Sequence, residues 1–509
     1  MLLNLNNFNQ FKERLPVFLA ESRYSLLLSL LAGALTVLAF APFNQAWLIY
    51  PLIAFLFYIW SLSSPKRTLL QGWLFGVGMQ CTGVSWIYFS LYYHGGSPSL
   101  FAVLLIFFLA AYLSIYTALA GFVVNRFCNA SNPIKLIFLY PITWALFEWL
   151  QGIVLTGFSW QQLGYTQIDL PLSGFAPLIG SHGVGLVAAM TAGGLISWLV
   201  NADCRRKIPT LLMVIWLAGF FLREVAWTDA SGDEIKVALI QGNVPQSLKW
   251  KQESKYPTLQ RYKQLSLEQK DVDLIIWPET AMPGFQHRLK SYIAGLSRAM
   301  QKTETDLLAG VFIRDFDTGR YYNSLINVNG GEYRKRHLVP LGEYVPLRSL
   351  IGFVNSFVKI PMSDIDSGDY EQALLQAAGQ PLGVSICFED AFARDVRKDL
   401  PEATLLVNVS NDAWFDGSIE PFQHHAIARM RALESGRFML RATNTGISSI
   451  IGPKGEEIAV SPQFETHVLK ASVQPMKGAT PYILWGDWLL VLSCLVVLGG
   501  FIFRAQRSH

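Results

Sequence analysis

The stretch PLGVSICFEDAF, residues 381–392, combines the pattern of a buried strand with a thiol and two carboxylates. Its first half is apolar and predicts a short β-strand that ends on Cys387, with Glu389 and Asp390 close behind. A thiol at the end of a buried strand suits a nucleophile, but many such cysteines only fill space in a core. This stretch alone leaves both interpretations open.

The composition is that of a membrane protein. Of the 509 residues 51% are hydrophobic and 15% are charged, whereas soluble domains carry about 25% charged residues. The net charge of +4 argues against a nucleic-acid partner. The five cysteines have neither CxxC spacing nor a neighbouring histidine, so we expect no metal, no other cofactor and no disulfide framework.

Apolar stretches divide the chain into a membrane part and a polar part. Seven of them precede residue 231 and one follows residue 477, and each is near the roughly 20 residues that cross a bilayer. They are 24–41, 46–62, 68–92, 99–124, 134–150, 173–200, 208–222 and 483–503. We therefore expect a membrane domain with seven transmembrane helices over 1–231, a globular domain over 232–477, and an eighth helix with a short tail over 478–509.

Lysine and arginine lie in alternate loops between these stretches. The loops 42–45, 93–98 and 151–172 hold none. The other set holds Lys12, Arg14, Arg23, Lys66, Arg67, Arg126, Arg205, Arg206, Lys207, Arg504 and Arg507. Because positive loops stay cytoplasmic, both termini are expected inside and the 232–477 domain outside, which in a bacterium is the periplasmic face.

This topology separates one cysteine from the other four. Cys128 and Cys204 fall on the cytoplasmic side, and Cys81 and Cys494 fall within apolar stretches. Cys387 is the only cysteine of the 232–477 domain, so it has no disulfide partner there even in an oxidising compartment. A free thiol in such a place favours a chemical role.

The 232–477 domain alternates strand and helix patterns, which predicts an α/β fold with a mixed sheet. Glu279 closes the predicted strand 272–277, Lys335 follows a hairpin, and Cys387 closes a further strand. Functional groups gather at the carboxyl ends of strands in such sheets, so we expect these three side chains to meet.

Three motifs in fixed order carry a resemblance to known proteins. They are IIWPET at 275–280, YRKRHLVP with GEYVP at 333–346, and ICFED at 386–390. Together they resemble the Glu–Lys–Cys signature of the nitrilase superfamily, and the added membrane stretches resemble the apolipoprotein N-acyltransferase family. The resemblance implies an α-β-β-α sandwich on a membrane base of eight transmembrane helices, in a bacterial inner membrane. It also implies transfer of an acyl chain from a phospholipid, through a thioester on Cys387, to the N-terminal amine of a lipoprotein's diacylglyceryl-cysteine.

The three residue types suit this chemistry. A thiol with a pKa of about 8.5 is mostly protonated at neutral pH and needs a base or a cation to activate it. Glu279 is the expected base, and the Lys335 ammonium is expected to favour the thiolate and then to stabilise the oxyanion. The backbone N–H of Phe388 is a candidate second donor, and ping-pong kinetics follow from the acyl-enzyme.

Further residues match the family's acidic and aromatic positions. By resemblance Glu343 and Glu389 orient Lys335 or the second substrate, although ion pairs with Arg334, Arg336 or Arg394 remain an alternative. Phe388 departs from the Tyr that many relatives carry, so a hydroxyl role there is absent. By resemblance Trp250 lines the site, although an aromatic after a turn often belongs to the core. Asn411 and Trp414 are expected to support the pocket wall.

Two other features are interpreted from the residues alone. His424 and His425 are adjacent, so on a helix they point about 100° apart and do not chelate one ion. The segment 347–361 is unusually apolar for an external loop, and it is either domain core or a lid that touches the bilayer. The candidate lid residues are Leu350, Ile351, Phe353, Phe357 and Val358.

Two other functions remain as alternatives. A membrane-tethered amidase would pass its acyl group from Cys387 to water. A scaffold that binds lipoproteins through an inactive nitrilase fold would not need the three residues, and their presence argues against it.

Overall fold

The computed structural model describes residues 16–344 and 364–507. The chain forms two compact units. We call Met1–Ser85, Val103–Val225 and Trp485–His509 the helical unit, and Trp86–Ala102 with Ala226–Leu484 the sheet unit. The candidate lid residues Leu350, Ile351, Phe353, Phe357 and Val358 lie outside the described residues.

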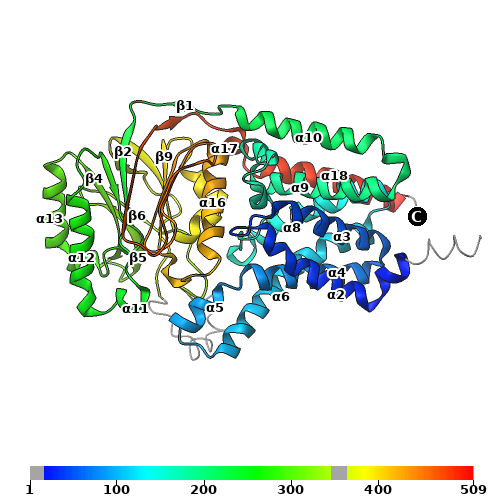
Figure 1. Cartoon of the computed structure of the whole chain (residues 1–509), viewed down its shortest axis with the longest axis horizontal. Coiled ribbons are helices and arrows are strands. Elements are labelled where there is room, and N and C mark those ends of the chain that lie inside the picture. Colours follow the sequence, from blue (N-terminus) through cyan, green and yellow to red (C-terminus); the bar gives the residue numbers. More distant parts are fainter. Residues whose placement is uncertain (1–15, 345–363, 508–509) are drawn as a thin grey trace, which may run out of the picture. The chain divides into compact units, whose positions relative to one another are not determined.

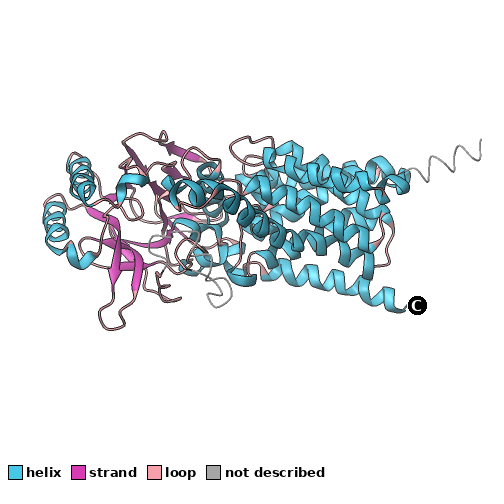
Figure 2. Ribbon diagram, turned by 90° about the horizontal axis from the view of Figure 1, so that it is seen from below, coloured by secondary structure: helices cyan, strands magenta, loops and turns pink. Residues whose placement is uncertain are grey.

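The helical unit consists of helices that run side by side (Figure 2). Its main helices are α2 (Arg23–Leu35), α3 (Ile49–Leu62), α4 (Pro65–Gly83), α8 (Tyr140–Gln151), α9 (Ala176–Val200), α10 (Lys207–Glu224) and α18 (Trp488–Arg507). Helix α6 (Ser99–Phe127) begins in the sheet unit and continues into the helical unit. Within the described residues, four helical stretches are long and apolar enough to cross a membrane: Ser99–Phe127, Asn132–Gln151, Pro171–Val200 and Trp488–Arg507. Two shorter apolar stretches are Arg23–Ala39 and Ala46–Leu62.

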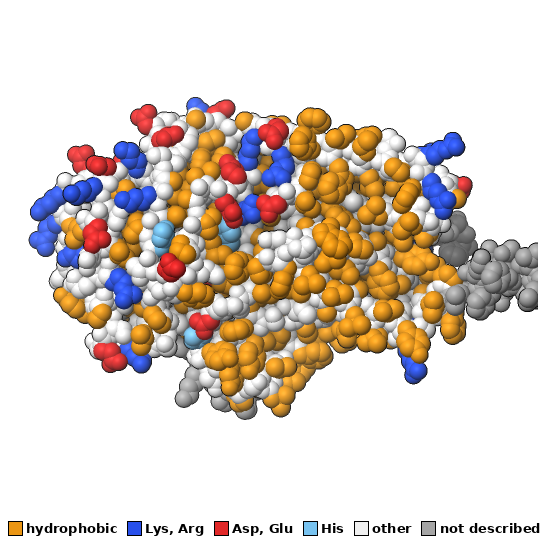
Figure 3. Space-filling view, in the orientation of Figure 1, with side chains coloured by type: hydrophobic (Ala, Val, Ile, Leu, Met, Phe, Trp, Pro, Cys, Tyr) orange, Lys and Arg blue, Asp and Glu red, His pale blue; other side chains and the backbone are white. Residues whose placement is uncertain are grey.

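The helical unit has the polarity of a protein in lipid. Hydrophobic side chains cover most of the face of it that Figure 3 shows, and Val496 and Phe221 are 74% and 64% exposed. Its buried positions include the polar residues Gln71, Thr143 and Ser197. Apolar surface of this extent is unfavourable in water, and it favours insertion of the unit in a bilayer.

The sheet unit contains two six-stranded mixed sheets. In order across the first sheet lie β13 (His467–Val473), β2 (Ile235–Gln241), β3 (Leu274–Ile276), β4 (Asp306–Arg314), β5 (Tyr321–Asn327) and β6 (Glu332–Arg334). In order across the second lie β12 (Glu457–Val460), β11 (Ser449–Ile451), β10 (Met439–Thr443), β9 (Leu405–Ser410), β8 (Gln380–Ile386) and β7 (Leu375–Ala377). Strands β2, β3 and β4 are parallel, as are β8, β9 and β10, and the outer strands pair antiparallel.

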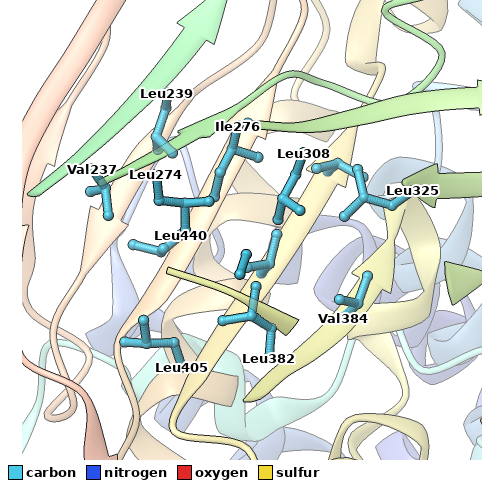
Figure 4. Packing of buried hydrophobic residues seen from close by; sticks show 14 of the residues in the cluster. Val237, Leu239, Leu274, Ile276, Leu308, Leu325, Leu382, Val384, Leu405 and Leu440 are labelled. Atoms are coloured by element: carbon cyan, nitrogen blue, oxygen red, sulfur yellow. The ribbon is translucent and has the colours of Figure 1, made fainter. Parts of the chain in front are cut away.

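The two sheets pack face to face through aliphatic side chains. Leu274, Ile276 and Leu325 of the first sheet meet Leu382 and Leu405 of the second in one buried cluster (Figure 4). The outer face of the first sheet packs on helices α12 (Gln252–Leu267) and α13 (Lys290–Gln301), and that of the second packs on α16 (Glu420–Ser435) (Figure 1). The order helix, sheet, sheet, helix agrees with the expected sandwich. Because both faces of each sheet are covered, β9 is buried at every position.

The sandwich brings the ends of distant strands to one place. Glu279 follows β3, Lys335 follows β6, and Cys387 follows β8. These three residues therefore lie at strand ends of two different sheets, and only the packing of one sheet on the other unites them.

Candidate active site

Cys387 stands at a sharp turn between β8 and the 3-10 helix η11 (Cys387–Ala391). Its φ angle is +55°, in the left-handed region that residues with a Cβ rarely adopt. Glu389 stabilises this turn, because its Oε2 accepts a hydrogen bond of 2.6 Å from the backbone N–H of Ile386. Strain of this kind persists only where the surroundings enforce it, and it is common at functional sites.

Lys335 is a buried cation held between two carboxylates. Its Nζ lies 2.9 Å from Glu343 Oε2, 3.0 Å from Glu343 Oε1 and 3.8 Å from Glu279 Oε1. The side chain of Lys335 is 1% exposed, so its charge depends on these partners in place of water.

Asn323, which no sequence motif singles out, connects these groups. From the middle of β5 its Nδ2 donates hydrogen bonds of 2.7 Å to Glu279 Oε1 and 3.1 Å to Glu343 Oε1. Its backbone carbonyl accepts a hydrogen bond of 2.8 Å from the N–H of Lys335. One buried amide thus holds both carboxylates and the lysine in register.

The electrostatics favour a neutral thiol beside a charged ammonium. Burial, and then the Glu279 carboxylate, raise the pKa of Cys387 to about 12, and the Lys335 cation opposes this only in part. Burial disfavours the charged form of Lys335, but Glu343 and Glu279 outweigh it and raise the pKa of the ammonium above its ordinary value. The resting site therefore holds a thiol, an ammonium and carboxylates, and the thiol needs a base.

Cys387, Glu279, Lys335 and Glu343 line one cavity of about 140 Å³. The rest of its wall is mostly apolar and includes Leu91, Val339, Leu341, Ile365, Trp414 and Phe415. A polar reactive end beside an apolar wall suits an acyl group whose carbonyl reacts and whose hydrocarbon is buried.

Part of this wall comes from the segment 86–102, which the sequence analysis assigned to a membrane stretch and a loop. Ser90, Leu91 and Gly95 line the cavity. The segment is held by the ring contact of Trp86 with Phe415, at 4.8 Å between centroids. It is also held by hydrogen bonds of 3.2 Å between Trp86 Nε1 and Gln423 Oε1 and between His94 Nε2 and Asp416 Oδ2. Apolar residues that suggested a membrane span, such as Leu91, line the cavity in the structure.

Comparisons with known proteins identify the family. The family profile of the apolipoprotein N-acyltransferase N-terminal domain matches residues 32–194, and that of the carbon-nitrogen hydrolases matches residues 236–482. The apolipoprotein N-acyltransferase of Methylococcus capsulatus is 44% identical over 489 residues, covering 95% of this chain and 97% of the relative. That of Photobacterium profundum is 39% identical, covering 92% and 93%. The chain belongs to the apolipoprotein N-acyltransferase family. Among solved structures, a Saccharomyces cerevisiae member of the nitrilase superfamily is similar at 19% identity with a TM-score of 0.38, covering 53% of this chain and 97% of that one.

The acidic residues expected from the N-acyltransferase family occupy different places. Glu343 contacts Lys335 directly. Glu389 is buried, and it accepts hydrogen bonds from the backbone N–H groups of Arg336, at 2.6 Å, and His337, at 2.9 Å, so it joins the chain that follows Lys335 to the turn at Cys387. The alternative ion pairs are absent from the described contacts of both glutamates. The arginines pair elsewhere, Arg334 with Glu332, Arg336 with Asp399 and Arg394 with Asp395.

The aromatic and amide candidates are divided between the cavity and its surroundings. Trp414 lines the cavity, whereas Trp250 is 39% exposed and packs on Phe312. Asn411 is buried, donates to Gln246 Oε1 at 2.9 Å and is not among the residues that line the cavity. Phe388 is buried against Phe392, with 5.0 Å between ring centroids.

Lys249 is a second buried lysine near the site that the sequence analysis missed. It ends helix α11 (Gln246–Lys249), and its Nζ donates a hydrogen bond of 3.1 Å to the backbone carbonyl of Glu279. Burial lowers the pKa of Lys249 to about 7, against the charges of Glu279 and Cys387. Its place directly before Trp250 was the only available signal, and nothing in the sequence separated it from a surface lysine.

Replacing Asn323 by Leu should lower the rate of acyl transfer by about 100-fold, because the two carboxylates and Lys335 lose their common anchor. The measurement is the single-turnover rate of the purified full chain. The matched control is Asn329→Leu on the exposed hairpin after β5, which should leave the rate unchanged. An Asn323→Leu protein with the wild-type rate would contradict the role given to this amide.

Alkylation of Cys387 by iodoacetamide should keep accelerating between about pH 7 and about pH 10, because a thiol with a raised pKa remains mostly protonated over this range. Mass spectrometry of the Cys387 peptide measures the rate. In protein unfolded by detergent the same thiol should level off above about pH 9, as expected for an ordinary pKa of about 8.5. An alkylation rate that levels off below about pH 9 in the folded protein would show that the pKa of the Cys387 thiol is not raised.

Proposed function

We propose that the protein transfers an acyl chain from a phospholipid, through a thioester on Cys387, to the N-terminal amine of the diacylglyceryl-cysteine of apolipoproteins. The observation that carries this proposal is the meeting of Cys387, Glu279 and Lys335 on one cavity with an apolar wall. Membership of the N-acyltransferase family selects this reaction among those that a Glu–Lys–Cys site can perform.

Acylation begins with attack of the Cys387 sulfur on the ester carbonyl of the phospholipid. Because the raised pKa keeps the thiol protonated, Glu279 takes the proton as the S–C bond forms. The carbonyl oxygen of the ester becomes an oxyanion, which the Lys335 ammonium and the backbone N–H of Phe388 stabilise. The C–O bond then breaks, Glu279 returns the proton to the leaving oxygen, and a lysophospholipid departs.

Deacylation repeats these steps with the lipoprotein amine as nucleophile. The neutral amine attacks the thioester carbonyl, and Glu279 takes a proton from the amine nitrogen as the N–C bond forms. The C–S bond then breaks, and Glu279 returns the proton to the sulfur. The products are an amide and the free thiol. Each step uses the protein's own side chains, and Lys335 stays protonated throughout because its carboxylate partners hold its charge.

The proposal includes a topology with eight transmembrane helices in a bacterial inner membrane, both termini cytoplasmic and the catalytic domain periplasmic. Its support is the alternation of positive loops with loops that lack lysine and arginine. The four long apolar helical stretches and the two shorter ones account for six crossings, and the proposal assigns the other two to α4 and α10. In this topology Cys387 lies on the periplasmic side, where the proposal also places the N-termini of the lipoprotein acceptors.

Incubation with phospholipid should increase the mass of the Cys387 peptide by one acyl chain, and the adduct should persist until an amine acceptor is added. A membrane-tethered amidase would leave no stable adduct, because water would release the acyl group. Intact-protein mass spectrometry before and after addition of a diacylglyceryl peptide distinguishes the two reactions.

Variants of the three residues complete this test. Cys387→Ala should abolish the adduct, and Glu279→Gln and Lys335→Ala should each lower transfer almost as far, since residues that act as a unit fail together. Full lipoprotein maturation by Cys387→Ala would instead support the scaffold.

Cysteine labelling tests the topology. In spheroplasts, a membrane-impermeant maleimide should label a cysteine at the exposed position 302 (Lys302→Cys), whereas Cys204, beside Arg205 and Arg206, should react only after lysis. Peptide mass spectrometry separates the two sites. Labelling of Cys204 in intact spheroplasts with protection of position 302 would reverse the orientation.

A further inference from the structure

Five ionisable side chains form a buried cluster directly behind the nucleophile. Asp390 lies in η11, Asp412 in the 3-10 helix η13 (Asp412–Trp414), Glu420 and His424 in α16, and Arg441 in β10. Each is at most 1% exposed. Removing so many charges from water is costly, so their mutual contacts must compensate for it.

Two members of the surrounding network bind the backbone of Cys387. His424 Nε2 lies 3.2 Å from the carbonyl oxygen of Cys387 and 2.8 Å from Asp390 Oδ1. Asn408 Nδ2 donates to the same carbonyl oxygen, also at 3.2 Å. Since a carbonyl only accepts, the imidazole nitrogen that faces it carries a proton.

The surroundings also favour a proton on the other ring nitrogen of His424. Its Nδ1 lies 3.2 Å from Glu420 Oε1 and 3.6 Å from Asp412 Oδ1. Although burial and Arg441 oppose protonation, Asp390 and Asp412 raise the pKa of His424 well above its ordinary value. The imidazolium therefore faces Glu420 and Asp412 at Nδ1, and Asp390 together with the Cys387 carbonyl at Nε2.

Arg441 supplies the second positive charge of the cluster. Its Nη2 lies 3.1 Å from Asp412 Oδ2, its Nη1 lies 3.6 Å from Asp390 Oδ2, and it also binds Asn408 Oδ1. Asp412, Glu420 and His424 lie close enough to hold a metal ion. However, Arg441 and His424 already pair with these three carboxylates, and so we interpret the cluster as structural support for the turn.

The clamp on the carbonyl determines where the next N–H points. In a trans peptide the C=O of Cys387 and the N–H of Phe388 point in opposite directions. With the oxygen held by His424 and Asn408, the Phe388 N–H is directed away from the buried cluster. The positive φ of Cys387 makes this orientation strained, so it requires such a restraint.

We propose that His424, together with Asn408, is a positioning residue that clamps the Cys387 carbonyl and thereby aims the Phe388 N–H at the oxyanion. This inference rests on the proposed function, because it assigns that N–H a role in thioester formation. It extends the site beyond Glu279, Lys335 and Cys387 to a buried imidazolium that does not touch the substrate.

The test compares two reactions of the same thiol. Acylation of Cys387 by p-nitrophenyl butyrate passes through an oxyanion, whereas alkylation by iodoacetamide does not. Purified full-length His424→Leu and the nearly isosteric Asn408→Asp should each slow acylation by about 100-fold and leave alkylation within about threefold of wild type. His424→Gln, which keeps one donor, should recover part of the acylation rate.

The chain offers a matched control in the adjacent residue. His425 lies on the same helix, but its Nε2 contacts Glu457 Oε1 at 2.7 Å and its Nδ1 contacts Ser449 Oγ at 3.2 Å. His425→Leu should therefore leave both rates near those of wild type. If His424→Leu fails to fold, Asn408→Asp and His424→Gln carry the comparison.

The outcomes separate this inference from the proposed function. Equal loss of acylation and alkylation in the clamp variants, or no loss of acylation, would overturn the clamp. A wild-type protein that is acylated by the nitrophenyl ester but not by phospholipid would count against the proposed function, and the selective loss in the variants would still support the clamp.

Discussion

A buried ammonium shared by two carboxylates beside a thiol is the constraint on which the rest of the site depends. Lys335 is almost wholly removed from water, and an isolated charge in that position would cost several kcal/mol. Glu343 and Glu279 compensate for this cost, and Asn323 keeps the two carboxylates from separating. The same arrangement keeps the lysine charged while the thiol stays neutral, so that charge develops only as the substrate reacts.

The sandwich of two sheets makes this arrangement possible. Glu279 and Lys335 come from the first sheet and Cys387 from the second, so the cluster of aliphatic side chains between the sheets sets their separation. Buried side chains outside the cavity bind two backbone carbonyls, Lys249 that of Glu279 and His424 that of Cys387. The chain turns at Glu279 and Cys387 are thus held by side chains that do not line the cavity.

The apolar half of the cavity is built from other parts of the chain. Leu91 lies in the segment 86–102, which is covalently continuous with α4 on one side and forms the start of α6 on the other. Trp414 and Phe415 follow β9 and lie on the same wall. A hydrocarbon chain therefore finds an apolar surface next to a strongly charged centre, a combination that suits an ester of a fatty acid better than a soluble amide.

The amino-acid sequence is enough to predict the class of the protein and the strands that end beside the site, and it contains the three motifs that hold Glu279, Lys335 and Cys387. Hydrophobic periodicity and loop charge are local properties of the chain. The motifs that contain Glu279, Lys335 and Cys387 can likewise be recognised without knowledge of the fold. Strand β13 escaped prediction because its pairing with β2 joins residues more than 200 positions apart. The roles of Asn323 and Lys249, and the contact of His424 with the Cys387 carbonyl, became visible only once the chain was folded. A polar residue inside a strand or helix has no local mark of function, and its role is decided by which distant carbonyl or carboxylate the packing of the two sheets brings within hydrogen-bonding distance.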